Sequence, residues 1–453
     1  MSEKYKFSKF NTYVENECGE MIIFNSLSIT NAFCKLNPDN TIIFKEALNK
    51  KQANLISENI LGHLLNRSMI VNDSIDEMKN LEYMKMQVIT RTLSGNILGL
   101  IILPTGKCNF RCEYCYENFK NGKMSKENQD AIIKFVRKKI YYHSGVSISW
   151  FGGEPLLEID IITYISKKIM DICNSLKKTY SANITTNGYL LSVENMKKLL
   201  SCNIYQYQIT IDGLQNIHDK YRHLIDGSPT FRQIETNLLN IKNNIKTCIF
   251  HISLRCNFTQ ESLTVLNDFS KWFYKCFEND NRFSIFVRTV GIYGKNNKLS
   301  NVLINDGIGN ICSKLFEKNQ KINNSNIIAN FQFLSPGGCV CYAGMDNHFV
   351  FDSLGNVRKC TVALSEDYNI VGKIENGEVI IDPSAMAKWV TPQPMHNKCY
   401  ECSFAGVCMD NVCHTNKVQG KVNTHPNCPH EKSAIKNLIL IYDKANKIEY
   451  IDK

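Results

Sequence analysis

The sequence predicts an α/β fold, with a parallel sheet curved into part of a barrel. Strand-like runs alternate with helical patterns between residues 97 and 290, and repeated βα units build parallel sheets or barrels. A small module precedes this region, and eight of the 19 cysteines follow it after residue 338, where long apolar runs are few. A chain of 453 residues is longer than one compact core normally holds, so two or three domains are expected.

The first 90 residues predict a small separate module. Residues 14–29 predict a hairpin that turns at Gly19, and residues 48–65 carry apolar side chains near helical spacing. A short charged connector, residues 72–80, follows them.

The central region predicts an incomplete barrel. Two helices are expected to begin after Ser125 and Ser192, because serine is a favoured N-cap residue. Six strands are too few for an eight-stranded barrel, and ligands of such folds bind at the carboxyl ends of the strands. The six strand-like runs are 97–104, 147–153, 182–188, 207–213, 250–257 and 283–290.

Three cysteines lie within eight residues directly after the first predicted strand, in CNFRCEYC (108–115). The spacing C-x3-C-x2-C can place three thiolates on three irons of a cubane cluster and leave the fourth iron open. A zinc site usually has a fourth protein ligand nearby, and none occurs here. Structural zinc and metal-free cysteines remain as alternatives.

This motif resembles the signature of the radical S-adenosylmethionine (SAM) superfamily, with Tyr114 as the aromatic residue before the last cysteine. The resemblance extends from residue 97 to the C-terminus. It implies that Cys108, Cys112 and Cys115 form the catalytic centre and hold a [4Fe–4S] cluster whose open iron chelates SAM. Reductive cleavage would give a 5′-deoxyadenosyl radical that takes hydrogen from the substrate. Thiolate-bound clusters reach about −700 mV, so an external low-potential reductant of the flavodoxin or ferredoxin type is implied.

Motifs after the next strands resemble the SAM-binding motifs of the same superfamily. In WFGGEP (150–155) the glycines let the main chain approach a ligand, and a carboxylate suits the amino group of SAM. Ordinary turns are the alternative for each motif. The residues implied to bind SAM are Tyr114, Gly152, Gly153, Glu154, Thr186, Asn187 and Thr210, with weaker candidates in Arg255 and Asn257. Site-shaping candidates in IHDKYRH, which also fits a solvated helix start, are His218, Asp219 and Arg222.

The C-terminal cysteines resemble the SPASM domain, whose seven-cysteine pattern is matched at every position. Four residues instead of three separate Cys408 from Cys413, which puts Cys413 in doubt as a ligand. The resemblance implies two auxiliary clusters, three clusters in all, and two zinc sites are the alternative. The implied outer ligands are Cys399, Cys402, Cys408 and Cys428, and the inner ones are Cys341, Cys360 and Cys413, with Cys339 as a possible fourth.

SPASM enzymes act mostly on peptides and proteins, so the resemblance implies a peptide substrate. The branch that matures sulfatases carries an aspartate where this chain has Thr361. The branch that modifies ribosomally made precursor peptides often forms thioethers, and an N-terminal winged-helix module often binds the leader by β-addition. The prediction is a peptide maturase that forms a thioether. Sulfatase maturation, epimerisation and C–C crosslinking are alternatives of the same class, and a non-enzymatic iron–sulfur or zinc protein is the alternative of another class.

The predicted domains are 1–90, a winged-helix-like leader-recognition module; 91–320, a partial (β/α)6 radical SAM barrel; and 321–453, a SPASM domain. The net charge of +10 is spread along the chain, so no nucleic-acid partner is expected. The apolar run 97–104 is too short to cross a bilayer, and the N-terminus lacks the apolar core of a signal peptide. We expect no membrane partner and a cytoplasmic location.

Overall fold

The computed structural model describes residues 4–28, 31–93, 95–119, 121–247, 249–259, 266–290, 334–338, 341–392, 394–409, 413–420, 428, 432, 435–446 and 448–452. The chain forms two compact units: residues 94–306 with 345–391, and residues 1–93 with 307–344 and 392–453. The division into three domains remains a prediction. No helix among the described residues is both long and apolar enough to cross a membrane.

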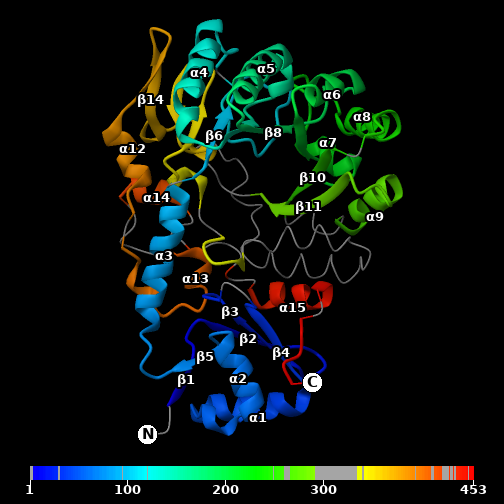
Figure 1. Cartoon of the computed structure of the whole chain (residues 1–453). Helices are drawn as coiled ribbons and strands as arrows, with labels where there is room; N and C mark the ends of the chain where they lie inside the picture. Colours follow the sequence, from blue (N-terminus) through cyan, green and yellow to red (C-terminus); the bar gives the residue numbers. More distant parts are fainter. Residues whose placement is uncertain are drawn as a thin grey trace. The chain divides into compact units, whose positions relative to one another are not determined.

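The sheet of the first of these units begins with six parallel strands that follow one another in chain order (Figure 1). All six predicted strands are confirmed within a few residues. They are β6 Ile97–Ile102, β7 Gly145–Trp150, β8 Thr179–Thr186, β9 Ile204–Thr210, β10 His251–Phe258 and β11 Phe283–Thr289. Parallel strands in chain order bring all their carboxyl ends to one edge of the sheet, where the motifs follow them.

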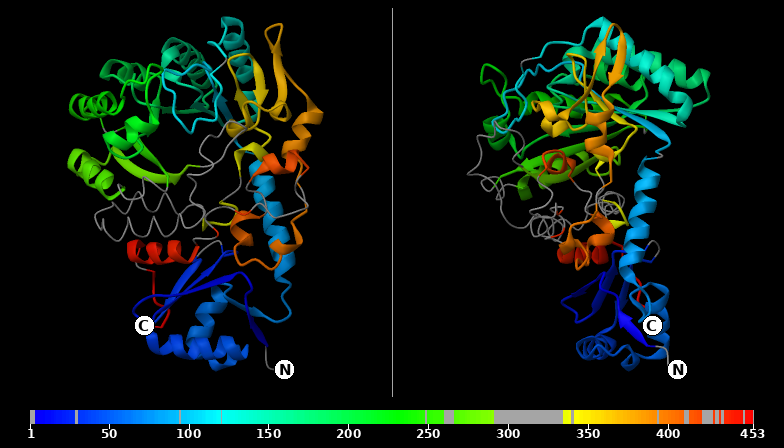
Figure 2. Two further views of the ribbon diagram at one scale, coloured as in Figure 1. Left: turned by 180° about the vertical axis from the view of Figure 1, so that it is seen from behind. Right: turned by 90° about the vertical axis from the view of Figure 1, so that its left-hand side faces the viewer.

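Helices connect these strands and lie along the outside of the curved sheet (Figure 2). The predicted caps are confirmed: the side chains of Ser125 and Ser192 accept from the backbone N–H of Asn128 and Asn195. The helices are α4 Lys126–Lys139, α5 Ile159–Ser175, α6 Val193–Leu200, α7 Gln215–Tyr221, α8 Phe231–Asn244 and α9 Leu266–Phe277, with short 3-10 turns at Ile140–Tyr142 and Pro155–Glu158.

Four further strands extend this sheet, where the sequence suggested little regular structure after residue 320. They are β12 His348–Phe351, β13 Asn356–Arg358, β14 Ile370–Glu375 and β15 Glu378–Ile381, followed by α12 Pro383–Val390. The first pairs in parallel with β6, and the others continue as antiparallel neighbours. A Cβ at Gly99 of β6 would lie 2.3 Å from the His348 ring, so glycine leaves room for that ring. These strands were not predicted, because runs this short show little of the apolar–polar alternation that marks a strand.

The N-terminal module contains the predicted hairpin. Strands β2 Asn11–Glu15 and β3 Met21–Asn25 are antiparallel, and Gly19 in the turn has a φ of +76°. A third strand, β4 Phe33–Leu36, pairs with β3. Two short strands, β1 Tyr5–Phe7 and β5 Ile70–Asn72, form a separate pair.

The predicted helix over residues 48–65 is wrong, because two helices share that stretch. Helix α1 Pro38–Lys50 ends at Lys51, which has the left-handed φ of 54°, and α2 Glu58–Asn66 follows a 3-10 turn at Ala53–Leu55. The apolar residues of both helices face one common core. Their spacing in the sequence therefore resembles that of one continuous helix. The predicted connector 72–80 is also partly wrong, since α3 Glu77–Leu93 begins inside it.

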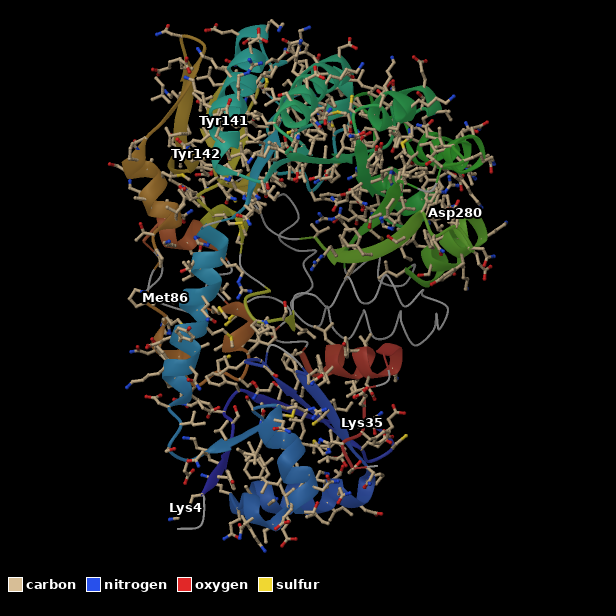
Figure 3. All side chains as sticks on the ribbon, viewed as in Figure 1. Lys4, Lys35, Met86, Tyr141, Tyr142 and Asp280 are labelled. Atoms are coloured by element: carbon tan, nitrogen blue, oxygen red, sulfur yellow. The ribbon has the colours of Figure 1, made fainter. Side chains whose placement is uncertain are left out.

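The C-terminal end of the chain covers the outer edge of β4. The backbone N–H of Lys35, labelled in Figure 3, donates to Glu449 O at 3.0 Å, and Ile451 N–H donates to Lys35 O at 3.1 Å. Ile451 is buried in the core of the module. Short helices complete this unit: Tyr342–Gly344, Asn397–Cys399, α13 Ala405–Cys408, α14 His414–Val418 and α15 Ile435–Asn446.

Candidate functional site

The cysteine loop follows β6, and the next motif follows β7 beside it. The strands are in register at this edge, with Ile102 opposite Trp150. Gly152 has a φ of +108°, which glycine adopts without strain. A Cβ on Gly153 would lie 2.2 Å from the Lys107 carbonyl oxygen, and Glu154 N–H donates to that oxygen at 2.9 Å. The two glycines therefore allow the backbones of the two loops to touch.

Glu154 joins the motif after β7 to the motif after β8. Its side chain is fully buried, and its carboxylate accepts from Leu156 N–H at 2.9 Å, Thr186 Oγ1 at 2.7 Å and Asn187 N–H at 2.7 Å. Burial raises the pKa of Glu154, and these hydrogen bonds oppose the rise. In this structure the carboxylate orders neighbouring loops; its contact with SAM stays a prediction.

Asn187 continues this chain of contacts to the cysteine loop. Its side-chain Nδ2 donates to Asn109 Oδ1 at 2.8 Å and lies 3.9 Å from Cys108 Sγ. Thr186, Asn187 and Thr210 are all buried at the carboxyl ends of β8 and β9. The loops that were predicted from separate motifs thus lie together at one edge of the sheet.

Tyr114 enters a polar network that the sequence did not predict as a unit. Its hydroxyl donates to Asp212 Oδ2, and it accepts from Arg222 Nη1 at 2.7 Å and Asn257 Nδ2 at 3.2 Å. Arg255 Nε donates to Asn257 Oδ1 at 2.8 Å. Sequence reasoning missed Asp212, although an acidic residue before Gly213 at a strand end was a usable signal.

Burial is the largest influence on the three thiols of the loop, and it raises the pKa of each of them. The pKa of Cys115 rises to about 12, with further increases from Glu117 and Cys112. The negative charges of Glu154 and of the other two cysteines add to the rise in the pKa of Cys108. The three sulfurs therefore lie within electrostatic reach of one another. Three such donors on one loop fit a cluster with three protein ligands. Binding must displace their protons, because thiolate is the ligating form.

A small pocket of about 40 Å³ adjoins the loop within the same unit. Glu117 lines it, and burial raises the pKa of that carboxyl to about 7. Ser353 also lines the pocket and is 4% exposed, and its hydroxyl has no hydrogen-bond partner among the described residues. A small pocket with one unpartnered hydroxyl beside the cysteine loop is a candidate place for a small group of a substrate.

The motif His218-Asp219-x-x-Arg222 organises the segment that follows β9. His218 Nδ1 accepts from Asp212 N–H at 3.2 Å, and its Nε2 lies 3.1 Å from Thr230 Oγ1. Asp219 accepts from the backbone N–H of Thr230 and Phe231, both at 2.8 Å, at the start of α8. Burial, and then the Arg222 cation, hold the pKa of His218 well below its usual value.

We expect acid to destabilise the fold through His218. Below the unfolded pKa of about 6.5, the unfolded chain binds a proton that folded His218 does not accept, so the free energy of unfolding falls by about 1.4 kcal/mol per pH unit. His218→Asn should be less stable at pH 7.5 but lose less stability between pH 6.5 and 5.5. Urea unfolding of both proteins at three pH values measures this difference. Equal pH slopes would contradict it.

The C-terminal cysteines are partly assembled in the other unit. Cys399 begins a turn in which Cys402 N–H donates to Cys399 O at 3.2 Å, and Cys402 packs against the apolar cluster that contains Cys408. Lys432 Nζ donates to Cys428 Sγ at 3.5 Å and also interacts with Cys402. The common ligation of these four cysteines stays a prediction.

The predicted ligands of the inner auxiliary cluster are brought together to a lesser extent. Cys341 belongs to the unit with the N-terminal module and Cys360 to the sheet unit, whereas Cys413 is exposed and bonds Thr415 Oγ1 at 2.9 Å. Cys339 lies outside the described residues. Among the described residues, no cysteine takes part in a disulfide, and no three His, Cys, Asp or Glu side chains converge on one metal-ion position.

Comparison with known proteins identifies the central region. Residues 102–266 match the model of the radical SAM superfamily. The cysteine-type anaerobic sulfatase-maturating enzyme of Clostridium novyi is 23% identical over 79% of this chain and 97% of its own. For five other curated relatives, at 24% to 35% identity, this chain spans 34% to 52% of their length.

Two solved structures share the fold. Native anSMEcpe with bound AdoMet and Cp18Cys peptide gives a TM-score of 0.60 at 20% identity, over 78% of this chain and 99% of that one. Streptococcus suis SuiB gives 0.51 at 16% identity, over 94% of this chain and all of that one. At these identities the likeness concerns the fold alone.

Proposed function

The chain is an enzyme with a radical SAM domain at residues 102–266, and on this premise we propose that it cleaves SAM reductively and modifies a ribosomally made peptide, with a thioether crosslink as the product. The single observation that carries the proposal is the docking of the three strand-end loops. Gly153 and Glu154 contact Lys107, and Asn187 contacts Asn109. An iron–sulfur carrier has no need of further strand-end motifs packed against its cysteine loop.

The cysteine loop is the proposed holder of the SAM-binding cluster. Cys108, Cys112 and Cys115 would ligate it, and the auxiliary clusters would use the C-terminal cysteines. When bound, such clusters supply a low-potential electron for SAM and an acceptor for the electron that the substrate loses. The chain itself excludes water from the part of the loop at Cys108, because Cys108, Glu154 and Asn187 are buried together.

The atom balance of a thioether constrains what the protein must provide. Joining sulfur to carbon breaks one S–H and one C–H bond and forms one S–C bond. The hydrogen atom from carbon goes to the 5′-deoxyadenosyl group, one electron leaves to an acceptor, and the thiol proton goes to a base or to solvent. The small pocket lined by Glu117 and Ser353 lies beside the cysteine loop, and we assign to it a small group of the substrate.

Sulfatase maturation is the second candidate, because the anSMEcpe fold is similar and the Clostridium novyi relative has that activity in its name. Thr361 argues against it. This residue starts the 3-10 turn Thr361–Ala363 after Cys360 and presents a hydroxyl instead of the expected carboxylate. A threonine hydroxyl is not a base at neutral pH.

Leader recognition by the N-terminal module is also a proposal. Strand addition needs a free sheet edge, because a new strand pairs through its backbone groups. The outer edge of β4 already carries the C-terminal residues 449–451 of the chain itself. A leader would therefore displace this segment or pair with β2 instead.

Anaerobic reconstitution tests the proposed function. With three cubanes we expect about twelve irons per chain, and reduction in the presence of SAM should release 5′-deoxyadenosine. Zinc without iron, or iron without deoxyadenosine, would remove the basis for the proposal.

A sulfatase-derived cysteine peptide separates the two candidate reactions. We expect the wild-type chain to release deoxyadenosine but to form no formylglycine, because Thr361 cannot take up the substrate proton. Mass spectrometry of the peptide measures the product, and Thr361→Asp serves as the matched variant. Formylglycine from the wild type would show that the inference from Thr361 is wrong.

A further inference from the structure

Arg222 is a buried cation with an incomplete set of partners. Its side chain is 7% exposed, and it follows α7 at the carboxyl edge of the sheet. Its Nε lies 4.0 Å from Asp212 Oδ2, too far for a hydrogen bond, and has no hydrogen-bond partner among the described residues. A buried guanidinium remains charged, so its position calls for a physical reason.

The backbone next to Arg222 pairs with the cysteine loop. Arg111 N–H donates to His223 O at 2.9 Å, and Glu113 N–H donates to Tyr221 O at 3.0 Å. A bridge between Phe110 and Leu224 is antiparallel and has the same register. These contacts place Cys112 directly opposite Arg222, and opposite residues of an antiparallel pair direct their side chains to the same face.

The side chain of Arg222 contacts the loop on both sides of Cys112. Its Nη1 donates to the Tyr114 hydroxyl at 2.7 Å, and its guanidinium carbon lies 5.6 Å from the centre of the Phe110 ring. The guanidinium is thus held along the loop by a hydrogen bond, a cation–π contact and the backbone pairing.

A second set of contacts fixes the backbone of Arg222. Thr230 Oγ1 donates to Arg222 O at 2.5 Å, and the same hydroxyl accepts from His218, which in turn accepts from Asp212 N–H. The chain of bonds leads from the end of β9 to the start of α8. It keeps Arg222 in place opposite the cysteine loop without the help of any ligand.

We propose that Arg222 is a positioning residue whose fixed positive charge holds the cysteine loop in its ligating conformation and raises the reduction potential of the cluster that this loop binds. Reduction adds a negative charge to the cluster, and a nearby buried cation stabilises that charge more than water-exposed residues do. The inference rests on the proposed function, because it assumes that Cys108, Cys112 and Cys115 ligate the cluster.

The test is an EPR-monitored redox titration of the reconstituted full chain without SAM. The signal of the site cluster is identified as the one absent from a Cys108→Ala/Cys112→Ala/Cys115→Ala chain. In Arg222→Met we expect at least a tenfold lower ratio of reduced to oxidised site cluster at fixed potential, which is a shift of about −59 mV. Arg222→Lys keeps the charge and should shift less.

Arg282→Met is the matched control. Arg282 is also largely buried and pairs with Asp280, which is labelled in Figure 3, but it precedes β11 and so lies at the opposite edge of the sheet. Its loss should leave the potential of the site cluster unchanged. Asp212→Asn removes the negative charge beside Arg222 with little change of shape, and it should shift the potential upward even if Arg222→Met does not fold.

The outcomes are separable. An unchanged potential in folded, fully loaded Arg222→Met, or a downward shift in Asp212→Asn, would overturn the role of Arg222. A wild-type chain without a cluster on the cysteine loop would instead overturn the proposed function. Equal downward shifts in Arg222→Met and Arg282→Met would show a general effect of losing a buried arginine, and would also overturn the inference.

Discussion

Replacing Cys108, Cys112 or Cys115 with alanine should abolish release of 5′-deoxyadenosine. Each thiolate is expected to ligate a different iron of one cubane, so the loss of one ligand leaves the cluster without a stable protein anchor. The C-terminal cysteines are separate in the chain and should keep their clusters. Iron content should therefore fall from about twelve to about eight per chain while deoxyadenosine falls to background.

Cys173→Ala is the matched control for these variants. Cys173 is buried on α5 and has no predicted ligand role, so its replacement should leave the iron content and SAM cleavage near the wild-type values. Deoxyadenosine formation by a chain that lacks one of the three loop cysteines would contradict the assignment of the cluster to this loop. Loss of all iron would show that the three sites do not load independently.

Gly153→Ala should have the next largest effect. Its Cβ would lie 2.2 Å from the Lys107 carbonyl oxygen, and that oxygen belongs to the backbone and cannot rotate away. The two loops must separate, and the Glu154–Lys107 hydrogen bond is lost with them. We expect a destabilisation of about 1–3 kcal/mol and a roughly 100-fold loss of SAM cleavage, because misplacing a site by about 1 Å costs that much.

The control for Gly153→Ala is Gly122→Ala. An added Cβ at Gly122 meets nothing within 4 Å, although the residue belongs to the segment between β6 and α4 that also contains Lys107. Thermal unfolding and deoxyadenosine assays of both variants separate loop contact from a general effect of alanine. Equal behaviour of the two variants would show that the close approach of the loops is not needed for SAM cleavage.

The predicted strands were recovered because each one is a β-rich run ended by turn residues, as in YQITIDG around β9. Helix α1 was misjudged because its end at Lys51 depends on a left-handed residue that carries no sequence mark. Strands β12 to β15 were missed because β12 is selected by its partner β6, which lies about 250 residues earlier in the chain. Local pattern contains no information on such pairing.

For the candidate site, too, the sequence determined some features and the tertiary structure determined others. The sequence alone determined the residue types: three thiols at ligating spacing, two glycines and a carboxylate after the second strand, and an arginine in the motif after the fourth strand. Only the tertiary structure decided how they act together. It placed Gly153 against Lys107, occupied the Glu154 carboxylate with three donors, and set Arg222 opposite Cys112. The physical reason is that spacing within one loop specifies a ligand set, whereas contacts between loops depend on the order and register of the strands that carry them.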